Sequence, residues 1–235
     1  AAAIPGLKSK KGIAAIKEYN FTIQVSPNDC TGCGNCADVC PAKEKALVMS
    51  PVAQQQAQQP IFDQLHANVG YRDDVAPKTQ NLKNSQFSQP LFEFSGACSG
   101  CGETPYLKAI TQLFGDRMMV ANATGCSSIY SSAFPSSPYC TDRHGRGPSW
   151  ASSLFEDNAE FGLGMRLGSE RMRDTVARLM KQGLECPKCS SELKEQFELW
   201  INNRSNPAIT RAVEEKIVPM MEACGCDTCK ELLQY

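Results

Sequence analysis

The sequence contains no apolar run of the length that a membrane-spanning helix needs, about 18 residues. It also lacks an excess of charge, because 24 Lys and Arg residues oppose 25 Asp and Glu residues and leave a net charge of −1. Such a balance gives no long-range attraction to nucleic acid or to an anionic membrane, so we expect neither as a partner. The first residues lack the apolar stretch of a signal peptide and contain no Met, so we expect the gene product to begin upstream.

Histidine is scarce, with two residues, whereas cysteine is abundant, with 13. An odd number excludes complete disulfide pairing, and the cysteines cluster at spacings typical of metal ligands. The clusters are 30/33/36/40, 98/101, 186/189 and 224/226/229. This pattern favours a reducing, cytoplasmic compartment with metal or cluster sites over a secreted disulfide framework.

The first cluster consists of Cys30, Cys33, Cys36 and Cys40, followed by Pro41, and it has the spacing of bacterial ferredoxins. Two-residue gaps let a tight loop wrap a cubane cluster while backbone N–H groups point at the sulfurs. The glycines between the cysteines permit the backbone conformations that such a loop requires. We therefore expect these four cysteines to bind [4Fe-4S] clusters, because structural zinc rarely uses this triple spacing.

In two-cluster ferredoxins the fourth cysteine of such a run binds the other cluster. Cys40 would then serve a second cube, yet residues 1–29 contain no partner cysteine run. We expect the chain to hold half of a two-cluster module, with the other half elsewhere. A single cluster, with Cys40 folding back onto it, is the alternative.

A second group of cysteines lies further along the chain. Cys98 and Cys101 form a glycine-flanked CxxC pair, a pattern typical of zinc, redox or cluster sites. Cys126 follows on a Gly-Cys turn just past an expected strand. Because ligands in open α/β folds bind outside the carboxyl ends of strands, these three cysteines point to one site.

Before residue 90 the chain is sparsely patterned. Alternating apolar residues predict a short strand over 21–25. Residues 51–90 are rich in Gln and punctuated by Pro, which favours a surface linker. We place a domain boundary in this linker.

After Phe94 the pattern is typical of an α/β domain followed by helices. The expected elements are a helix over 104–114, a buried strand over 117–121, a long helix opened by a capping box at 153–156, and two C-terminal helices. Their expected inner faces contain Tyr106, Leu107, Ile110, Leu113 and Phe114, then Phe155, Ala159, Met172, Val176 and Leu179, then Leu193, Phe197, Trp200 and Ile201, and finally Ile209, Val213, Ile217 and Met221. We expect Asn206 to cap the last helix, Pro219 to kink or end it, and the glycines over 162–168 to mark close packing.

Three further stretches carry a family resemblance: GACSGCGETPY, ANATGCSSIY and SLFEDNAEFGLGM. With the ferredoxin run before them, they make the stretch from about Tyr19 to Met165 resemble the pyruvate:ferredoxin (flavodoxin) oxidoreductase family. The resemblance implies a multidomain homodimer with a two-cluster ferredoxin-like domain, followed by a thiamine diphosphate domain with a third, proximal [4Fe-4S] cluster. Residues 1–85 would be the second half of an α+β ferredoxin-like domain with its linker. Residues 86–235 would be the N-terminal part of an α/β thiamine diphosphate-binding domain, with a helical, cysteine-containing insertion over about 183–235.

The resemblance also implies roles for individual residues. Cys98, Cys101 and Cys126 match three ligands of the proximal cluster. Glu103 and Cys126 match positions that lie against thiamine diphosphate, and the run from Cys30 to Cys40 matches the second ferredoxin run. The family's fourth proximal-cluster cysteine and its Mg²⁺-binding Gly-Asp-Gly motif lie further on, so Mg²⁺ ligands are expected outside these residues. No catalytic side chain is assigned here.

The chemistry that the resemblance implies is the thiamine-dependent oxidative decarboxylation of pyruvate to acetyl-CoA and CO₂. Coenzyme A takes the acetyl group, and electrons pass through the clusters to ferredoxin or flavodoxin, in a cytoplasmic enzyme of anaerobic metabolism. We expect the chain to be an internal segment of this larger polypeptide. A stand-alone ferredoxin-type electron carrier with an appended cysteine-rich domain is the alternative.

The remaining clustered cysteines are left open by the sequence. Cys186, Cys189, Cys224, Cys226 and Cys229 flank a predicted helical pair. Three alternatives are open: a zinc site formed by four of the five thiolates, a disulfide, or free thiols. No histidine lies close to them in the sequence, so any zinc site would be formed by thiolates alone.

Overall fold

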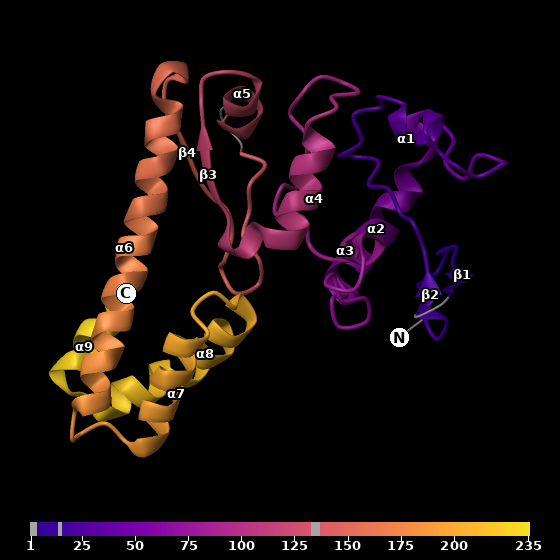
Figure 1. The fold of residues 1–235 in the computed structure, drawn as a ribbon. Helices are drawn as coiled ribbons and strands as arrows, with labels where there is room; N and C mark the ends of the chain where they lie inside the picture. The colour runs from indigo at the N-terminus through magenta and orange to yellow at the C-terminus, as the bar shows by residue number, and fades with distance from the viewer. Residues whose placement is uncertain (1–3, 14–15, 133–136) are drawn as a thin grey trace. The chain divides into compact units, whose positions relative to one another are not determined.

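The computed structural model describes residues 4–13, 16–132 and 137–235 (Figure 1). The chain divides into two compact units, Ala1–Asn158 and Ala159–Tyr235. Within the described ranges, no helix combines the length and the apolar character that crossing a bilayer requires. The second unit is predominantly helical, whereas the first combines short helices with two small sheets and long irregular segments.

The first unit begins with a short antiparallel pair, in which β1 (Lys10–Lys11) lies beside β2 (Asn20–Phe21). The sequence predicted a longer strand, and this prediction is wrong beyond Phe21. Ile23 and Val25 lie outside the strand and are exposed. The alternating pattern there has no partner strand among the described residues, so it forms no ladder.

Residues 51–90 contain helices that the sequence did not predict. They are η2 (Val52–Gln54), η3 (Gln56–Gln58), α2 (Gln59–Asn68) and α3 (Leu82–Ser85). Ile61 on α2 and Ser85 on α3 are buried, so these helices pack onto the first unit rather than lie as a solvated strip. They were missed because the stretch is rich in Gln and punctuated by Pro, a composition that favours a linker.

A parallel βαβ unit follows, in agreement with the predicted α/β pattern. It consists of β3 (Met119–Asn122), α5 (Cys126–Ser132) and β4 (Ser149–Ser152). The two strands pair in parallel, with Val120 opposite Trp150. The position of the predicted strand over 117–121 is thus confirmed, although Met119 is half exposed rather than buried. Strand β4 was not predicted.

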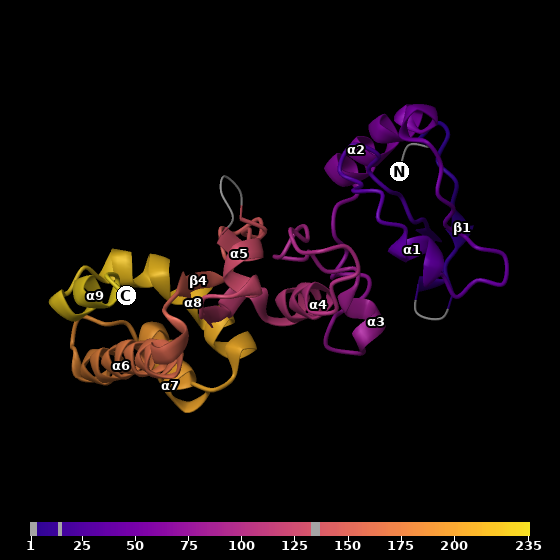
Figure 2. The ribbon, with the colours of Figure 1, turned by 90° about the horizontal axis from the view of Figure 1, so that it is seen from above.

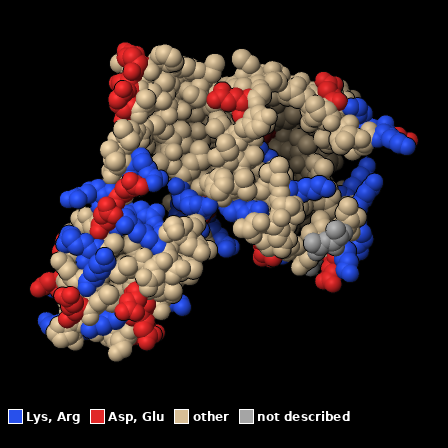
Figure 3. All heavy atoms as spheres, in the orientation of Figure 1, with Lys and Arg blue, Asp and Glu red and all other residues tan. Residues whose placement is uncertain are grey.

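Helix α4 (Thr104–Phe114) forms where it was predicted, but it buries a different face. Thr111 and Gln112 are buried, and the Gln112 side-chain amide donates a hydrogen bond to the Ser88 carbonyl at 2.9 Å. The predicted inner residues Tyr106 and Phe114 are exposed. Figure 3 shows few charged side chains over α4 and α5 on the face drawn there, which agrees with an exposed apolar surface.

The second unit is a helical assembly around one apolar core. It comprises most of α6 (Asn158–Glu185), then α7 (Ser191–Asn202), α8 (Pro207–Cys224) and α9 (Asp227–Leu232) (Figures 1 and 2). The core residues of this unit are Leu179, Met180, Cys189, Leu193, Phe197, Val213, Ile217, Met221, Cys226, Cys229 and Leu232. The predicted apolar faces of α7 and α8 are confirmed, because both supply their predicted residues to this core.

The ends of the long helices differ from the sequence predictions. Ser153 does not cap α6, because its hydroxyl contacts the Asn158 side chain, at 3.1 Å from Oδ1, rather than a backbone N–H of the helix. A 3₁₀ turn, η5 (Phe155–Asp157), lies between Ser153 and the helix. Phe155 is exposed, and α6 buries residues only from Ala177 onward. Asn206 caps α8 as predicted, but the helix continues through Pro219, because its apolar face is held by the core on both sides of the proline.

Close packing at glycine occurs in α6, but not where it was predicted. A Cβ added at Gly164 or Gly168 would meet nothing within 4 Å among the described residues. At Gly183, by contrast, it would lie 2.6 Å from Cε2 of Phe197, whose side chain is fully buried. Gly183 therefore lets α7 approach the end of α6 closely.

This contrast predicts opposite effects for two alanine substitutions in one helix. Gly183→Ala forces the buried Phe197 ring to move and should lower the free energy of unfolding of the second unit by about 1–3 kcal/mol. Gly168→Ala, in open helix surface, should raise it by about 0.5–1 kcal/mol, because alanine favours the helix. Urea unfolding followed by circular dichroism measures both changes. A stabilised Gly183→Ala protein would contradict the packing described here.

Candidate functional site

The ferredoxin-type run forms an open loop around a single helical turn. Gly32 and Gly34 adopt φ angles of +71° and +81°, which side chains other than glycine rarely tolerate. Cys36 lies on α1 (Asn35–Asp38), which begins directly after Gly34. A Cβ at either glycine would meet nothing within 4 Å among the described residues, so this part of the loop leaves room for a bound group.

Backbone N–H groups of this loop point at its sulfur atoms. The Ala46 N–H donates to Cys40 Sγ at 3.3 Å. Hydrogen bonds from the N–H groups of Ala42 and Ala46 lower the pKa of Cys40 below its usual value, and the nearby Lys45 ammonium adds to the effect. The pKa of Cys33 is lowered mainly by the N–H of Asn35. Donors of this kind stabilise a thiolate, the form in which cysteine binds metal.

A buried polar contact fixes the entry to this loop. Ser26 is buried, and its hydroxyl lies 2.6 Å from an Asp29 carboxylate oxygen. Gln59, at the start of α2, accepts a hydrogen bond from the Asn28 N–H at 3.1 Å. Helix α2 thus holds the turn that leads into Cys30. The shape of the ferredoxin-type loop therefore depends on a segment outside the cysteine motif.

The Cys98–Cys101 pair forms a second tight turn. The Cys101 N–H donates to the Cys98 carbonyl at 3.0 Å, and Gly100 adopts a φ angle of +75°. The N–H groups of Glu103 and Thr104, at the start of α4, lower the pKa of Cys101. This turn therefore repeats, on a different element, the donor arrangement of the ferredoxin-type loop.

The structure brings the two cysteine loops together, although more than fifty residues separate them in the sequence. The Ser99 hydroxyl contributes to the lowering of the pKa of Cys33. A Cβ built at Gly100 would lie 3.6 Å from Nδ2 of Asn35. Each loop therefore supplies groups to the surroundings of the other, and sequence reasoning found neither Ser99 nor Asn35.

Cys126 occupies the place that the sequence predicted for it. It begins α5 immediately after the loop that follows the carboxyl end of β3, and it is exposed. Tyr130, on the same helix, is buried against Phe92, with ring centroids 5.9 Å apart. Burial raises the pKa of Tyr130, and the nearby Glu103 carboxylate raises it further. Helix α5 therefore lies close to the turn that carries Cys101 and Glu103.

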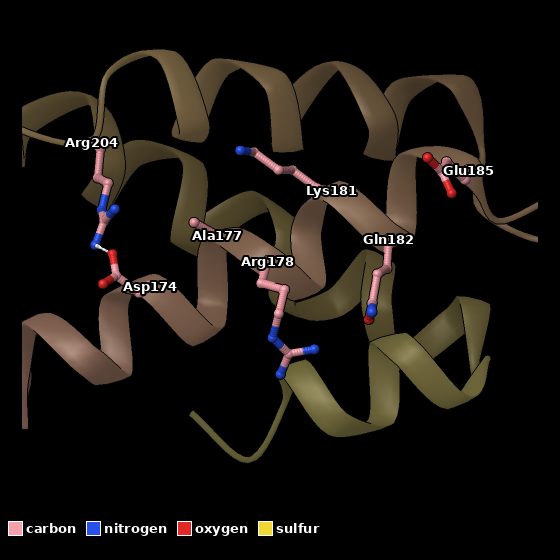
Figure 4. A pocket seen from close by; sticks show the side chains of 7 residues that line it. All are labelled: Asp174, Ala177, Arg178, Lys181, Gln182, Glu185 and Arg204. Atoms are coloured by element: carbon pink, nitrogen blue, oxygen red, sulfur yellow. Dashed lines mark hydrogen bonds and ion pairs between the residues drawn. The ribbon is translucent and has the colours of Figure 1, made fainter.

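The second unit holds a separate concentration of sulfur and a charged hollow. Cys189, Cys224, Cys226 and Cys229 lie within metal-binding reach of one another. The hollow, between α6 and the segment that carries Arg204, contains an ion pair between Asp174 and Arg204 at 2.5 Å (Figure 4). Exposed pairs of this type contribute little to stability, and the hollow contains no residue of the predicted sites.

Comparison with known proteins agrees with this geometry. Residues 23–43 match the family described as "4Fe-4S binding domain". The chain is 47% identical to pyruvate-flavodoxin oxidoreductase of Klebsiella pneumoniae over 94% of its length, and 50% identical to pyruvate:ferredoxin oxidoreductase of Moorella thermoacetica over 86%. The chain is homologous to one segment of the pyruvate:ferredoxin (flavodoxin) oxidoreductases. It spans 19% and 17% of the length of these two relatives.

The similarity to pyruvate:ferredoxin (flavodoxin) oxidoreductases extends well beyond the ferredoxin-type run. The relative from Rhodospirillum rubrum is 43% identical over 96% of the chain, which includes both cysteine loops and most of the helical second unit. The resemblance drawn from four short motifs is therefore confirmed across nearly the whole sequence. Four widely spaced motifs in one order were sufficient to find it.

The N–H donors at Cys101 predict a difference in reactivity between two cysteines of the iron-free chain. The pKa of Cys101 is lowered, whereas burial and then Glu93 raise the pKa of Cys140 to about 11. Because alkylation requires the thiolate, Cys101 should react with iodoacetamide at a lower pH than an ordinary cysteine. Cys140 should remain protonated and unreactive until the pH approaches its own pKa of about 11.

Peptide mass spectrometry after short exposures across a pH series measures both profiles in the same sample. Glu93→Gln is the matched control: it should shift the Cys140 profile to lower pH and leave the Cys101 profile unchanged. Coincident profiles for Cys101 and Cys140 would show that the backbone donors do not act on Cys101.

Proposed function

We propose that this chain forms part of a pyruvate:ferredoxin or pyruvate:flavodoxin oxidoreductase. The whole enzyme would be a cytoplasmic homodimer that takes pyruvate and coenzyme A, releases acetyl-CoA and CO₂, and transfers electrons to ferredoxin or flavodoxin. Sequence similarity over nearly the whole chain supports this proposal. The observation that carries it is the close approach of the two cysteine loops, where a Cβ at Gly100 would lie 3.6 Å from Nδ2 of Asn35. This approach joins two loops in which N–H donors lower the pKa of a cysteine.

The ferredoxin-type loop fits an iron–sulfur cluster. Three of its four cysteines are exposed and Cys40 is partly exposed. N–H donors lower the pKa values of Cys33 and Cys40, and open space lies next to Gly32 and Gly34. We propose that Cys30, Cys33, Cys36 and Cys40 bind [4Fe-4S] clusters, with residues 1–85 as the second half of a ferredoxin-like domain. The clusters would supply one-electron carriers whose potentials depend on such N–H donors.

The second loop fits a proximal cluster next to an organic cofactor. We propose that Cys98, Cys101 and Cys126 are three ligands of this cluster, within a thiamine diphosphate-binding domain that begins near residue 86. Thiamine diphosphate, when bound, supplies the ring that stabilises a carbanion next to a carbonyl carbon. Glu103 and Cys126 would lie against it, and the sequence contains no Gly-Asp-Gly motif to hold its Mg²⁺.

The chain's own residues would keep these groups close to one another. Glu103 follows Cys101 by two residues, and its carboxylate raises the pKa of Tyr130. Tyr130 lies on α5, the helix that begins at Cys126. The Cys98–Cys101 turn also lies close to the ferredoxin-type loop, where Gly100 approaches Asn35. One turn thus faces both neighbours, and short separations favour electron transfer over competing reactions.

A stand-alone electron carrier is the second candidate. A carrier would need the ferredoxin-type loop but would have no use for the carboxylate of Glu103 or for the βαβ unit that presents Cys126. It would also explain less of the similarity, since the matched 4Fe-4S binding domain covers residues 23–43 alone.

Cys101→Ser in the enzyme that contains this segment tests the proposal. Loss of this ligand should remove the iron and sulfide of one [4Fe-4S] cluster and lower pyruvate-dependent ferredoxin reduction by at least about 100-fold, because the cluster nearest the cofactor is missing. Cys140→Ser, which changes a cysteine outside both loops, should keep full iron content and activity.

Two further results separate the candidates. The proposal requires that pyruvate oxidation by the unmodified enzyme depends on added thiamine diphosphate after the cofactor is removed. Full iron content in the Cys101→Ser enzyme would reject the ligand assignment. Reversible redox cycling of the protein without any thiamine diphosphate-dependent reaction of a 2-oxoacid would favour the carrier.

A further inference from the structure

Four sulfur atoms meet inside the second unit. The Sγ atoms of Cys189, Cys224, Cys226 and Cys229 all lie within 4.8 Å of one another. Cys189 Sγ lies 3.8 Å from Cys224 Sγ, 4.0 Å from Cys226 Sγ and 3.9 Å from Cys229 Sγ. Three of the four residues are buried, whereas Cys30, Cys33, Cys98 and Cys126 of the first unit are exposed.

These separations match the edges of a tetrahedral metal site. Zinc binds thiolate sulfur at about 2.3 Å, so a regular tetrahedron of four sulfurs around it has edges of about 3.8 Å. We propose that Cys189, Cys224, Cys226 and Cys229 bind one zinc ion as a structural tetrathiolate site. This site uses none of the cysteines that we propose as iron–sulfur ligands in the first unit.

Other arrangements of the four cysteines fit the geometry less well. In a [4Fe-4S] cluster each thiolate binds a separate iron at its own corner, so the sulfurs would be much further apart than in a site with one metal ion. A disulfide would bring one pair to bonding distance, yet all four are free thiols. Cysteine also occurs as a small apolar core residue, but the convergence of four sulfurs from three segments on one point is the arrangement that a shared metal ion needs.

The surrounding backbone supports the same ligand set. Cys226 Sγ accepts a hydrogen bond from the Cys229 N–H at 3.4 Å, a contact typical of the surroundings of a metal-bound thiolate. Gly225 adopts a φ angle of +59° and ends α8 between two of the ligands. The chain therefore reverses direction at Gly225, which brings Cys226 Sγ close to Cys224 Sγ.

The bound ion would connect three parts of the second unit. Cys189 precedes α7, Cys224 ends α8, and Cys226 and Cys229 lie at the start of α9 and within it. Helix α9 has six residues, too few to form without tertiary support. Small units with limited cores often use a metal in this way, and the free energy of metal binding then contributes to folding. Binding exchanges the four thiol protons for one Zn²⁺, and no electrons are transferred.

Cys186 provides a matched control within the same loop. It completes a CxxC spacing with Cys189, and the sequence leaves open which four of the five cysteines are ligands. The structure leaves Cys186 outside the group of four. The structure therefore makes a definite prediction for a conservative substitution whose effect the spacing leaves open.

The test measures zinc in the full chain, purified without oxygen from cells grown with zinc. Elemental analysis should find one zinc per chain in addition to iron. X-ray absorption at the zinc edge, which iron does not obscure, should show four sulfur neighbours at about 2.3 Å. Cys186→Ser should keep the zinc and its four sulfurs, whereas Cys229→Ser should lower zinc content or affinity at least tenfold. Amide hydrogen exchange in Asp227–Leu232 should accelerate in Cys229→Ser and remain slow in Cys186→Ser.

Several outcomes would overturn the proposal. They are a chain without zinc, zinc with nitrogen or oxygen neighbours, loss of zinc in Cys186→Ser, or a disulfide among the four cysteines in the oxygen-free protein. Because the wild-type and Cys186→Ser measurements do not depend on the folding of Cys229→Ser, the proposal stays testable if that variant unfolds.

Discussion

Hydrogen bonds from backbone N–H groups to cysteine sulfur organise the candidate site of the first unit. The Ala46 N–H donates to Cys40 Sγ at 3.3 Å, and N–H groups of residues that closely follow Cys33 and Cys101 lower the pKa values of those thiols. The donors reach the sulfurs because glycines with positive φ let the loops curl tightly. Loops of this shape are prepared to hold thiolates before any iron arrives, and the same donors would later adjust the reduction potential of a bound cluster.

The two units use cysteine in opposite ways. In the first, the thiols lie on exposed loops, where a redox group has access to neighbouring groups and to partners. In the second, three of four converging thiols are buried within a core of apolar side chains. Exposure suits electron exchange, whereas burial suits a permanent structural ligand, so a single chain would carry both kinds of site without one interfering with the other.

Local patterns predicted the elements better than the faces they bury. The α7 and α8 faces were confirmed because their apolar stripes meet within one helical core. On α4 the apolar stripe is exposed instead, and Gln112 is buried through a hydrogen bond to the Ser88 carbonyl. The sequence also missed α2, which lies in a Gln-rich stretch interpreted as a linker, and β4, which has only four residues. Their places depend on contacts with distant residues, such as Val120 opposite Trp150.

The cysteine spacings by themselves determined the ferredoxin-type loop, the second CxxC turn and the position of Cys126 after a strand, because ligand geometry within one loop is a local property of the chain. Only the tertiary structure decided which distant groups meet. It placed Gly100 beside Asn35, and it selected Cys189 rather than Cys186 to join Cys224, Cys226 and Cys229. Spacing along the chain cannot express these choices, since they depend on how helices pack against one another in three dimensions.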